Sequence, residues 1–570
     1  MNKENIKETF KLPIEYRQHI PINDNINNDL ELLNTVDNSN TLVYNHLFNP
    51  KTTVGEITIE SWGKGYTNDS KFLKESQKIY SNFNILQNTD IVDKMTNDWR
   101  EIKGIGDIEE KYQYIEWDQL KWLNYNPILL QILSILNITS PLLQLITPLI
   151  MLILPFFFLK LLGHNININN YIDVLKQIIA KNQLGQILVN FQGASIKTKV
   201  YGIVMLGFYL YSIYQNIISC YHFYTNAYYI IDKINSLKKY LKYTNDKMIK
   251  FSNSIEPYKT YTDFNNNLKN SIHNNEIFIN ELDALPEKTR TIKTVRIFGL
   301  IMKTFYKLHY DSNINELLLF SLGFNGYIDT LEGLNNNILN KDINPIKFTS
   351  KNKCSFKEIY HPSLKDLSPI KNNISLNKSI IITGPNAAGK TTLLKSTIIN
   401  LIFTQQTGFG FYKKGVLNPY KYIHSYINIP DSCSRDSLFQ SEARRCKNIL
   451  DIIEKNKKDR HFCVFDELYS GTNPYEAISN AYGYLDYIIK NKNVKIILTT
   501  HYIKLCKLFR NNTKIKNYNM ETFVENHVSN NTYKLVPGYS TTKGGLAVLK
   551  SLDYPTTIIN KAKNIIENIE

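Results

Sequence analysis

Two long stretches of this 570-residue chain are apolar and carry no charge, unlike the rest. No Asp, Glu, Lys or Arg lies between Trp122 and Leu159, and residues 141–163 (PLLQLITPLIMLILPFFFLKLLG) are almost wholly apolar. A second uncharged stretch runs from Val200 to Ile231. About 20 helical residues cross a hydrocarbon layer of about 30 Å. The pattern therefore predicts two transmembrane helices, at about 141–163 and 200–220, within an apolar region at 127–231. The alternative is a pair of buried core helices.

The remaining pattern predicts helices first and an alternation of strands and helices afterwards. Residues 232–345 are polar and rich in lysine, with apolar positions such as Ile297, Leu300, Ile301 and Phe305 at helical spacing. From residue 346, short β-branched runs alternate with helical segments. We expect a mostly helical region over 1–126, a helical lever-like region over 232–345, and an α/β domain over 346–570.

Composition narrows the class of protein. Lys plus Arg number 67 against 51 Asp plus Glu, a formal charge of +16, which favours nucleic acid or anionic lipid as a partner. The six cysteines are scattered and form no C-x-x-C pair, so we expect reduced thiols in an intracellular protein. The polar N-terminus shows no secretory signal.

The segment IIITGPNAAGKTTLLK (380–395) carries the clearest sign of a binding site in this sequence. Gly384, four intervening residues, then Gly389, Lys390 and Thr391 match the phosphate-binding pattern G-x-x-x-x-G-K-[ST]. Glycines let successive N–H groups point at an anion, the following helix adds its positive N-terminal end, and the lysine reaches the β- and γ-phosphates. The residues expected to contact ATP are Gly384, Pro385, Asn386, Ala387, Ala388, Gly389, Lys390, Thr391 and Thr392.

Two later strands supply the expected partners of this loop. HFCVFDE (461–467) is an apolar strand ending in Asp466, which we expect to hold Mg²⁺ together with Thr391, and Glu467, the expected general base. VKIILTTH (494–501) ends in His501, placed to contact the γ-phosphate. A structural histidine is the alternative. ATP and Mg²⁺ are the expected cofactors, and ATP hydrolysis to ADP and phosphate the expected reaction.

These motifs together resemble the ATPase domain of the MutS family, the DNA mismatch-repair and recombination ATPases of the ABC superfamily. TGPNAAGKTT, DELYSGTNPYEA and TTHY carry the resemblance in order. Further segments are similar to the family over about residues 350–570: YHPSL (360–364), KNNISL (371–376), QQTGFGFY (405–412), DSLFQSEA (436–443) and the run 533–562. The segment 29–62 resembles the start of the MutS core domain.

The resemblance implies a homodimer whose two sites are completed across the interface. Ser437 falls at the position that reaches the partner's γ-phosphate, and Asn386 at the loop position that contacts the same phosphate. The loop departs from the family by showing Ala387-Ala388-Gly389 where mismatch-repair members show Met-Gly-Gly. The charged Arg435-Asp436 stands where the family has a glycine just before the segment of Ser437.

We expect a divergent MutS-like protein without the domain that reads mismatches, because only about 28 residues precede the core-like segment. The expected function is an ATP-gated dimeric clamp on DNA, in mismatch repair or recombination-type processes. The alternative is a membrane-tethered ABC-type ATPase whose ligand is not DNA. In both cases the apolar segments predict membrane association, with the ATPase domain in the cytoplasm. An interaction scaffold that binds ATP without turnover is disfavoured by the intact Lys390, Asp466 and Glu467.

Overall fold

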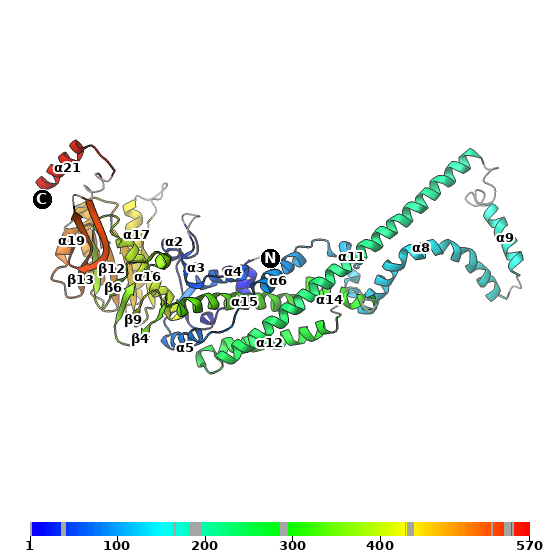
Figure 1. Cartoon of the computed structure of the whole chain (residues 1–570), viewed down its shortest axis with the longest axis horizontal. Helices are drawn as coiled ribbons and strands as arrows, with labels where there is room; N and C mark the ends of the chain where they lie inside the picture. Colours follow the sequence, from blue (N-terminus) through cyan, green and yellow to red (C-terminus); the bar gives the residue numbers. More distant parts are fainter. Residues whose placement is uncertain are drawn as a thin grey trace. The chain divides into compact units, whose positions relative to one another are not determined.

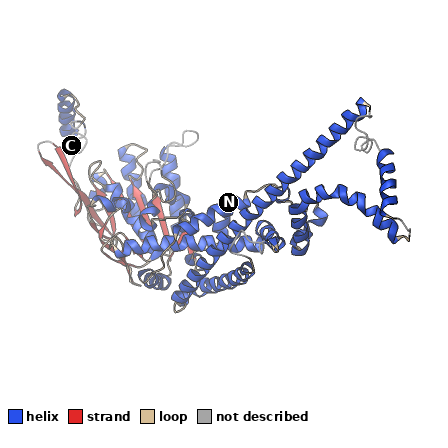
Figure 2. Cartoon of the chain, turned by 45° about the vertical axis from the view of Figure 1, so that its right-hand side comes forward, coloured by secondary structure: helices blue, strands red, loops and turns tan. Residues whose placement is uncertain are grey.

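The computed structural model describes residues 3–35, 41–163, 167–181, 195–285, 295–427, 429, 438–525, 528–540, 549 and 552–569. The chain divides into two compact units. One consists of Lys94–Tyr243 with Asn274–Leu318, and the other of Asn2–Asp93, Thr244–His273 and Leu319–Glu570. Figure 2 shows that the strands are gathered in one part of the chain and that the rest is almost wholly helical. The domain limits expected from the sequence stay a prediction.

The second unit is built around a six-stranded sheet with the order β10-β11-β12-β7-β13-β14. Its members are β7 (Ser379–Thr383), β10 (Tyr422–Tyr426), β11 (His461–Asp466), β12 (Val494–Thr500), β13 (Ile515–Glu525) and β14 (Val528–Pro537). The first five strands run parallel, and β14 returns antiparallel to β13 at the edge. Continuous apolar runs such as Ile380–Ile382 suit this sheet, because parallel strands are covered on both faces. This part of the chain is therefore an α/β domain, as the sequence predicts.

Helices flank this sheet, and a smaller sheet lies in the same unit (Figure 1). The flanking helices are α16 (Lys390–Thr407), α17 (Leu438–Lys455), α18 (Pro474–Ile488) and α19 (Ile503–Leu508), and η4 (Pro362–Leu367) precedes the phosphate loop. The last described helix of the chain is α21 (Thr556–Ile569). The smaller sheet has the order β4-β9-β5-β6, from β4 (Lys347–Phe348), β5 (Cys354–Ile359), β6 (Asn372–Ser375) and β9 (Lys414–Leu417). A two-stranded pair joins β3 (Asn344–Pro345) to β8 (Phe409–Gly410).

The N-terminal segment packs into the same unit as this α/β domain. Its elements are α1 (Lys3–Thr9), η1 (Pro13–Tyr16), β1 (His19–Pro21), α2 (Asp24–Asp29), α3 (Val43–Phe48), α4 (Thr53–Trp62), β2 (Gly65–Thr67) and α5 (Ser70–Ser81). One hydrophobic cluster runs from Tyr44 and Trp62 through Phe403 on α16 to Ile382 on β7. The N-terminal segment and the sheet therefore share a core.

Two adjacent glutamines on α16 join this helix to the N-terminal segment. The Gln405 side-chain amide donates to the carbonyls of Thr67 (3.1 Å) and Tyr420 (2.8 Å). Gln406 Nε2 lies 2.7 Å from the Trp62 carbonyl and 2.9 Å from that of Gly65. Both glutamines are fully buried. The end of β2 is thus hydrogen-bonded to the phosphate-loop helix.

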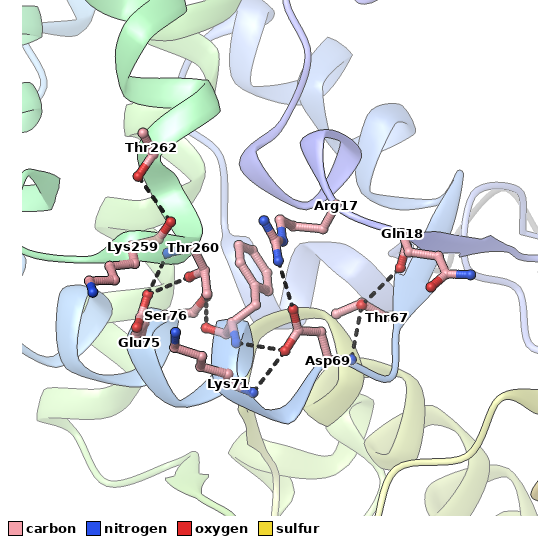
Figure 3. Close-up of polar contacts among 11 residues, drawn as sticks. Arg17, Gln18, Thr67, Asp69, Lys71, Glu75, Ser76, Lys259, Thr260 and Thr262 are labelled. Atoms are coloured by element: carbon pink, nitrogen blue, oxygen red, sulfur yellow. Dashed lines mark hydrogen bonds and ion pairs between the residues drawn. The ribbon is translucent and has the colours of Figure 1, made fainter.

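Polar contacts also hold α5 to the segment before it and to the turn at η3 (Lys259–Tyr261), as Figure 3 shows. Asp69 caps α5 by accepting from the backbone of Lys71 (2.9 Å), and Arg17 donates to its other oxygen (3.3 Å). Glu75 accepts from the backbone N–H of Thr260 at 2.9 Å. An acidic cap of this kind satisfies N–H groups that a helix leaves without partners.

The first unit is helical. Its elements are α6 (Thr89–Lys103), α7 (Ile108–Tyr112), η2 (Asp118–Tyr125), α8 (Pro127–Leu161), α9 (Ile168–Lys181), α11 (Ile196–Ile255), α12 (Thr262–Asp283), α14 (Phe298–Tyr310) and α15 (Ser312–Leu339), of which α6, α11, α12 and α15 extend into the other unit. Within this unit the buried Lys233 pairs with Asp98 and Glu101, each at 2.5 Å. Tyr114, Phe298 and Phe305 belong to its apolar interior.

Both apolar segments are helical, and they differ from the expected ranges. The first helix, α8, begins at Pro127 instead of 141, because Asn126 caps it and Pro127 occupies its first position. The second apolar segment is the beginning of the 60-residue α11. A further helix, α9, lies between them. Pro127–Thr147 and Lys199–Ile255 are long and apolar enough to cross a membrane by length and composition, and this is weak evidence of a membrane span.

Replacing Gln406 with Leu should destabilise the protein by about 2–5 kcal/mol, because the buried carbonyls of Trp62 and Gly65 lose their donor. Urea unfolding of the detergent-purified protein measures the loss. The matched control is Gln18→Leu at an exposed position, expected to change stability by less than about 0.5 kcal/mol. Equal unfolding midpoints for both variants would show that the amide does not hold β2.

Candidate nucleotide site

The phosphate loop connects the central strand β7 to α16. Three of its residues have positive φ: Gly384 (155°), Ala387 (60°) and Gly389 (90°). Glycine adopts such angles without cost, whereas Ala387 bears strain in the left-handed region. Asn531 on β14 donates to the Ala387 carbonyl at 3.3 Å and supports this conformation. The loop therefore opens directly onto the N-terminus of α16, where backbone N–H groups favour an anion.

Lys390 projects into the loop that precedes it. Its ammonium donates to the carbonyls of Gly384 and Pro385, each at 3.0 Å, and lies 3.3 Å from Nε2 of His501. Burial lowers the pKa of Lys390, with Glu467 and Asp466 acting in the opposite direction. The sequence-predicted lysine is thus positioned at the concave side of the loop, close to both acidic residues of β11.

Thr391 and Asp466 come together as expected from the sequence. The Thr391 hydroxyl donates to Asp466 Oδ2 at 2.9 Å, and Thr499 on β12 donates to the other carboxylate oxygen. A hydroxyl and a carboxylate are hard oxygen ligands that suit Mg²⁺, which takes few protein ligands and keeps waters and phosphates. No group of three or more His, Cys, Asp or Glu side chains that could hold a metal occurs among the described residues.

Glu467 and His501 are hydrogen-bonded to each other beside this hydroxyl–carboxylate pair. Glu467 Oε1 lies 2.6 Å from His501 Nε2, and this hydrogen bond holds the pKa of Glu467 below its ordinary value. The carboxylate is therefore ionised at neutral pH and able to accept a proton. Glu467 has φ of 52°, and its N–H donates to the Thr499 carbonyl at 3.1 Å. Strain at a non-glycine residue persists only where the surroundings enforce it.

The residue that enforces the conformation after Glu467 is Glu442 on α17, for which the sequence analysis assigned no role. Its carboxylate accepts from Ser470 N (3.1 Å), Ser470 Oγ (3.0 Å) and Gly471 N (3.1 Å). It is only 2% exposed. Tyr469, with φ of 59°, donates its N–H to the Tyr426 hydroxyl at 3.2 Å. The signal in the sequence was an acidic residue among the apolar positions of an amphipathic helix.

A pocket adjoins the phosphate loop, and the wall opposite the loop is apolar and aromatic. It is lined by Asn386, Ala387, Gly389, Lys390, Thr391, Thr392 and Glu467 on one side, and by Pro369, Ile370, Met520 and Tyr533 among others. Asn372 fixes the Tyr533 strand by donating to its carbonyl (2.9 Å) and accepting from Leu535 N (2.8 Å). The apolar and aromatic wall suits a purine ring beside a phosphate cradle. This wall could not be predicted from the sequence, because Tyr533 lies far from the loop in the chain.

The remaining residues predicted to contact ATP lie at different positions around the loop. Asn386 and Thr392 line the pocket, Pro385 offers its carbonyl to Lys390, and Ala388 is buried beneath the loop. Ser437, the predicted contact to a partner's nucleotide, lies outside the described residues. The roles assigned to all these residues stay predictions.

Replacing Glu467 with Gln should leave ATP bound but lower turnover at least about 100-fold, because the attacking water loses its base while the metal ligands remain. Lys390→Ala should instead weaken nucleotide binding itself. Steady-state phosphate release and fluorescent-nucleotide titration separate the two effects. If the Glu467→Gln protein turned over ATP within a few-fold of the rate of the unaltered protein, Glu467 would not be the general base.

Replacing Glu442 with Gln should lower kcat about tenfold or more without raising KM for ATP, because the loop that carries Glu467 loses an acceptor while the phosphate loop is untouched. Glu454→Gln, near the C-terminal end of the same helix and paired with Lys457, is the matched control and should leave both constants unchanged. A rise in KM at constant kcat would show that Glu442 acts on nucleotide binding and not on the position of the base.

Comparison with known proteins locates the similarity of this chain. The family model described as MutS domain V matches residues 380–570. The DNA mismatch repair protein MutS of Persephonella marina (strain DSM 14350 / EX-H1) is 29% identical over 251 residues, 43% of this chain and 28% of that protein. The protein of the same name from Clostridium botulinum (strain Okra / Type B1) is 31% identical over 249 residues, which are 42% of this chain and 26% of that protein. The match thus spans about a quarter of these relatives' length. Residues 380–570 of this chain are therefore similar to MutS domain V.

Proposed function

We propose that this protein binds ATP with Mg²⁺ and hydrolyses it to ADP and phosphate. The observation that carries the proposal is the convergence, at the carboxyl ends of β7, β11 and β12, of Lys390, the Thr391–Asp466 pair and the Glu467–His501 pair. MutS domain V, an α/β domain of the ATPase type, supports it at family level.

The chemistry follows from the positions of these groups. The loop N–H groups and Lys390 would hold the β- and γ-phosphates, and Mg²⁺, held by Thr391 and Asp466, would neutralise charge on them. A water oxygen attacks the γ-phosphorus, its proton passes to Glu467, and the bond to the β-phosphate oxygen breaks with ADP leaving. His501, bonded to Glu467, is placed to orient the carboxylate and to meet the γ-phosphate.

The proposed use of this energy is an ATP-gated clamp on DNA. The relatives are DNA mismatch repair proteins by name, and the formal charge of +16 favours a polyanionic partner. In the proposed homodimer, Ser437 of each copy contacts the nucleotide of the other. ATP then shifts the population toward the closed dimer, because it binds that state more tightly. Repair or recombination-type processes are the proposed setting.

A second candidate is a membrane-tethered ABC-type ATPase whose ligand is not DNA. The observation that favours it is the exposure of apolar side chains along α8 and α11, such as Leu154, Phe158, Ile203 and Phe208. We propose that these two helices form a hairpin in a bilayer, with the ATPase domain in the cytoplasm. A membrane hairpin is compatible with DNA or with another molecule as the ligand. A measurement of DNA binding therefore discriminates the two candidate functions.

Polar contacts between the two apolar helices support their pairing. Gln144 on α8 donates to the Ser212 hydroxyl on α11 at 2.5 Å and accepts from Asn216, while the Tyr209 hydroxyl donates to the Gln144 carbonyl at 3.2 Å. Cys220 donates to the Ile138 carbonyl at 3.3 Å. In hydrocarbon, a polar side chain without a partner is costly, so such groups join neighbouring helices.

The clamp proposal predicts that ATP drives dimerisation and tight duplex binding. Sedimentation of the detergent-solubilised Glu467→Gln protein should give a dimer with ATP and a monomer with ADP. Adding Ser437→Arg should abolish the dimer while nucleotide still binds, whereas Ser479→Arg, at an exposed position on α18, should not. A protein that hydrolyses ATP but never binds duplex DNA at low salt would favour the second candidate.

The hairpin proposal predicts that the expressed protein stays in the membrane fraction after an alkaline carbonate wash. Charges on the exposed apolar faces, Leu154→Glu with Phe208→Glu, should release it, because a charge at the bilayer centre costs about 3 kcal/mol or more. Leu86→Glu, also at an exposed position but outside these helices, is the control and should remain bound. Recovery of the unaltered protein as a soluble dimer without detergent would identify these segments as core helices.

A further inference from the structure

The four-stranded sheet β4-β9-β5-β6 has one side in the core and one side in solvent. Side chains alternate along its strands. Phe348, Phe356 and Leu417 are buried in the hydrophobic cluster. Lys347, Lys357 and Lys414 occupy the other side and are exposed. They line a shallow groove with Ser355, Gly415 and Val416 among others. We call this solvent side the lysine face.

Register places the lysines of this face unusually close together. Lys357 on β5 is directly opposite Lys414 on β9, and Lys347 on β4 is directly opposite Val416, two residues along β9 from Lys414. Partners in such positions have Cα atoms about 5 Å apart, and like charges placed directly opposite destabilise a sheet. In the part of the chain that the structure describes, no carboxylate forms an ion pair with any of these three lysines, while the neighbouring Lys413 is paired with Glu358 (2.8 Å). The lysine face therefore carries a concentrated positive charge that an anion would relieve.

The uncharged residues of the lysine face indicate which kind of polyanion it can bind. Ser355 and Val416, which lie opposite each other in the register, share this side of the sheet with the lysines. None of the four strands contributes a large exposed apolar or aromatic side chain. Single-stranded nucleic acid is held by stacking bases on aromatic rings, and a membrane surface by inserting apolar side chains. A row of exposed lysines on strands without either feature suits the regularly spaced phosphates of a duplex.

We propose that the lysine face binds the phosphate backbone of duplex DNA through Lys347, Lys357 and Lys414, without reading its sequence. This inference rests on the proposed DNA binding and assigns part of it to the ATPase-bearing unit. The contacts are purely electrostatic and add to affinity equally for every sequence.

The test is the salt dependence of duplex binding by the full-length protein in detergent. The triple replacement of Lys347, Lys357 and Lys414 by Gln should make the slope of log K against log salt less negative by about 2–3. The reason is that each phosphate contact contributes about 0.9 to the steepness of this slope. The loss should be the same for duplexes of unrelated sequence. ATPase activity without DNA should be unchanged, and the midpoint of thermal unfolding should not fall, because a like-charge pair has been removed.

The control variant replaces Lys447, Lys457 and Lys490 with Gln and so removes the same net charge. Each of these lysines is exposed and paired with an acidic residue close by in sequence (Asp451, Glu454 and Asp486). The control should keep the slope of the unaltered protein. An unchanged slope in the lysine-face variant, with binding intact, would overturn this inference alone. Absence of duplex binding in the unaltered protein would overturn the DNA proposal with it. A greater loss on single-stranded DNA, or on vesicles of phosphatidylserine and phosphatidylcholine, would assign the face to another ligand.

Discussion

The burial of α16 on all sides is the constraint on which the rest of the second unit depends. This helix begins at the phosphate loop, and nearly all its residues from Leu393 to Thr407 are buried. An ATPase helix of this kind would need only one apolar face against the sheet. Here its other face carries Gln405 and Gln406, whose amides are satisfied by β2 and its neighbours. The N-terminal segment is therefore part of the environment that fixes the phosphate loop, and not a separate appendage.

Helix α17 connects the N-terminal segment to the loop that follows Glu467. Glu442 holds the loop after Glu467, and one turn further Arg445 reaches Asp29 on α2 (3.2 Å) while donating to the Ser425 carbonyl (2.9 Å). Burial raises the pKa of Asp29, although Ser425 and Arg445 act against that shift. One helix thus binds both the loop that carries the proposed base and the N-terminal segment.

The sequence predicted those parts of the site whose chemistry is local. Gly384 to Thr391 form a contiguous motif, and Asp466, Glu467 and His501 each follow a recognisable apolar strand, so parallel pairing brings them together. Glu442, Tyr533 and Gln406 act through tertiary contacts, and no spacing rule connects them to the loop. The start of α8 was missed for a different reason. A hydropathy window centres on the most apolar residues, whereas Asn126 and Pro127 set the first turn.

The most direct test of the central claim is a structure of the full-length protein with a non-hydrolysable ATP analogue and Mg²⁺. The account predicts triphosphate in the loop, with Lys390 turned from the carbonyls of Gly384 and Pro385 to the phosphates. It further predicts Mg²⁺ at Thr391 and Asp466, and a purine against Tyr533. Nucleotide bound elsewhere, or Lys390 still bonded to its own loop with the analogue present, would contradict it.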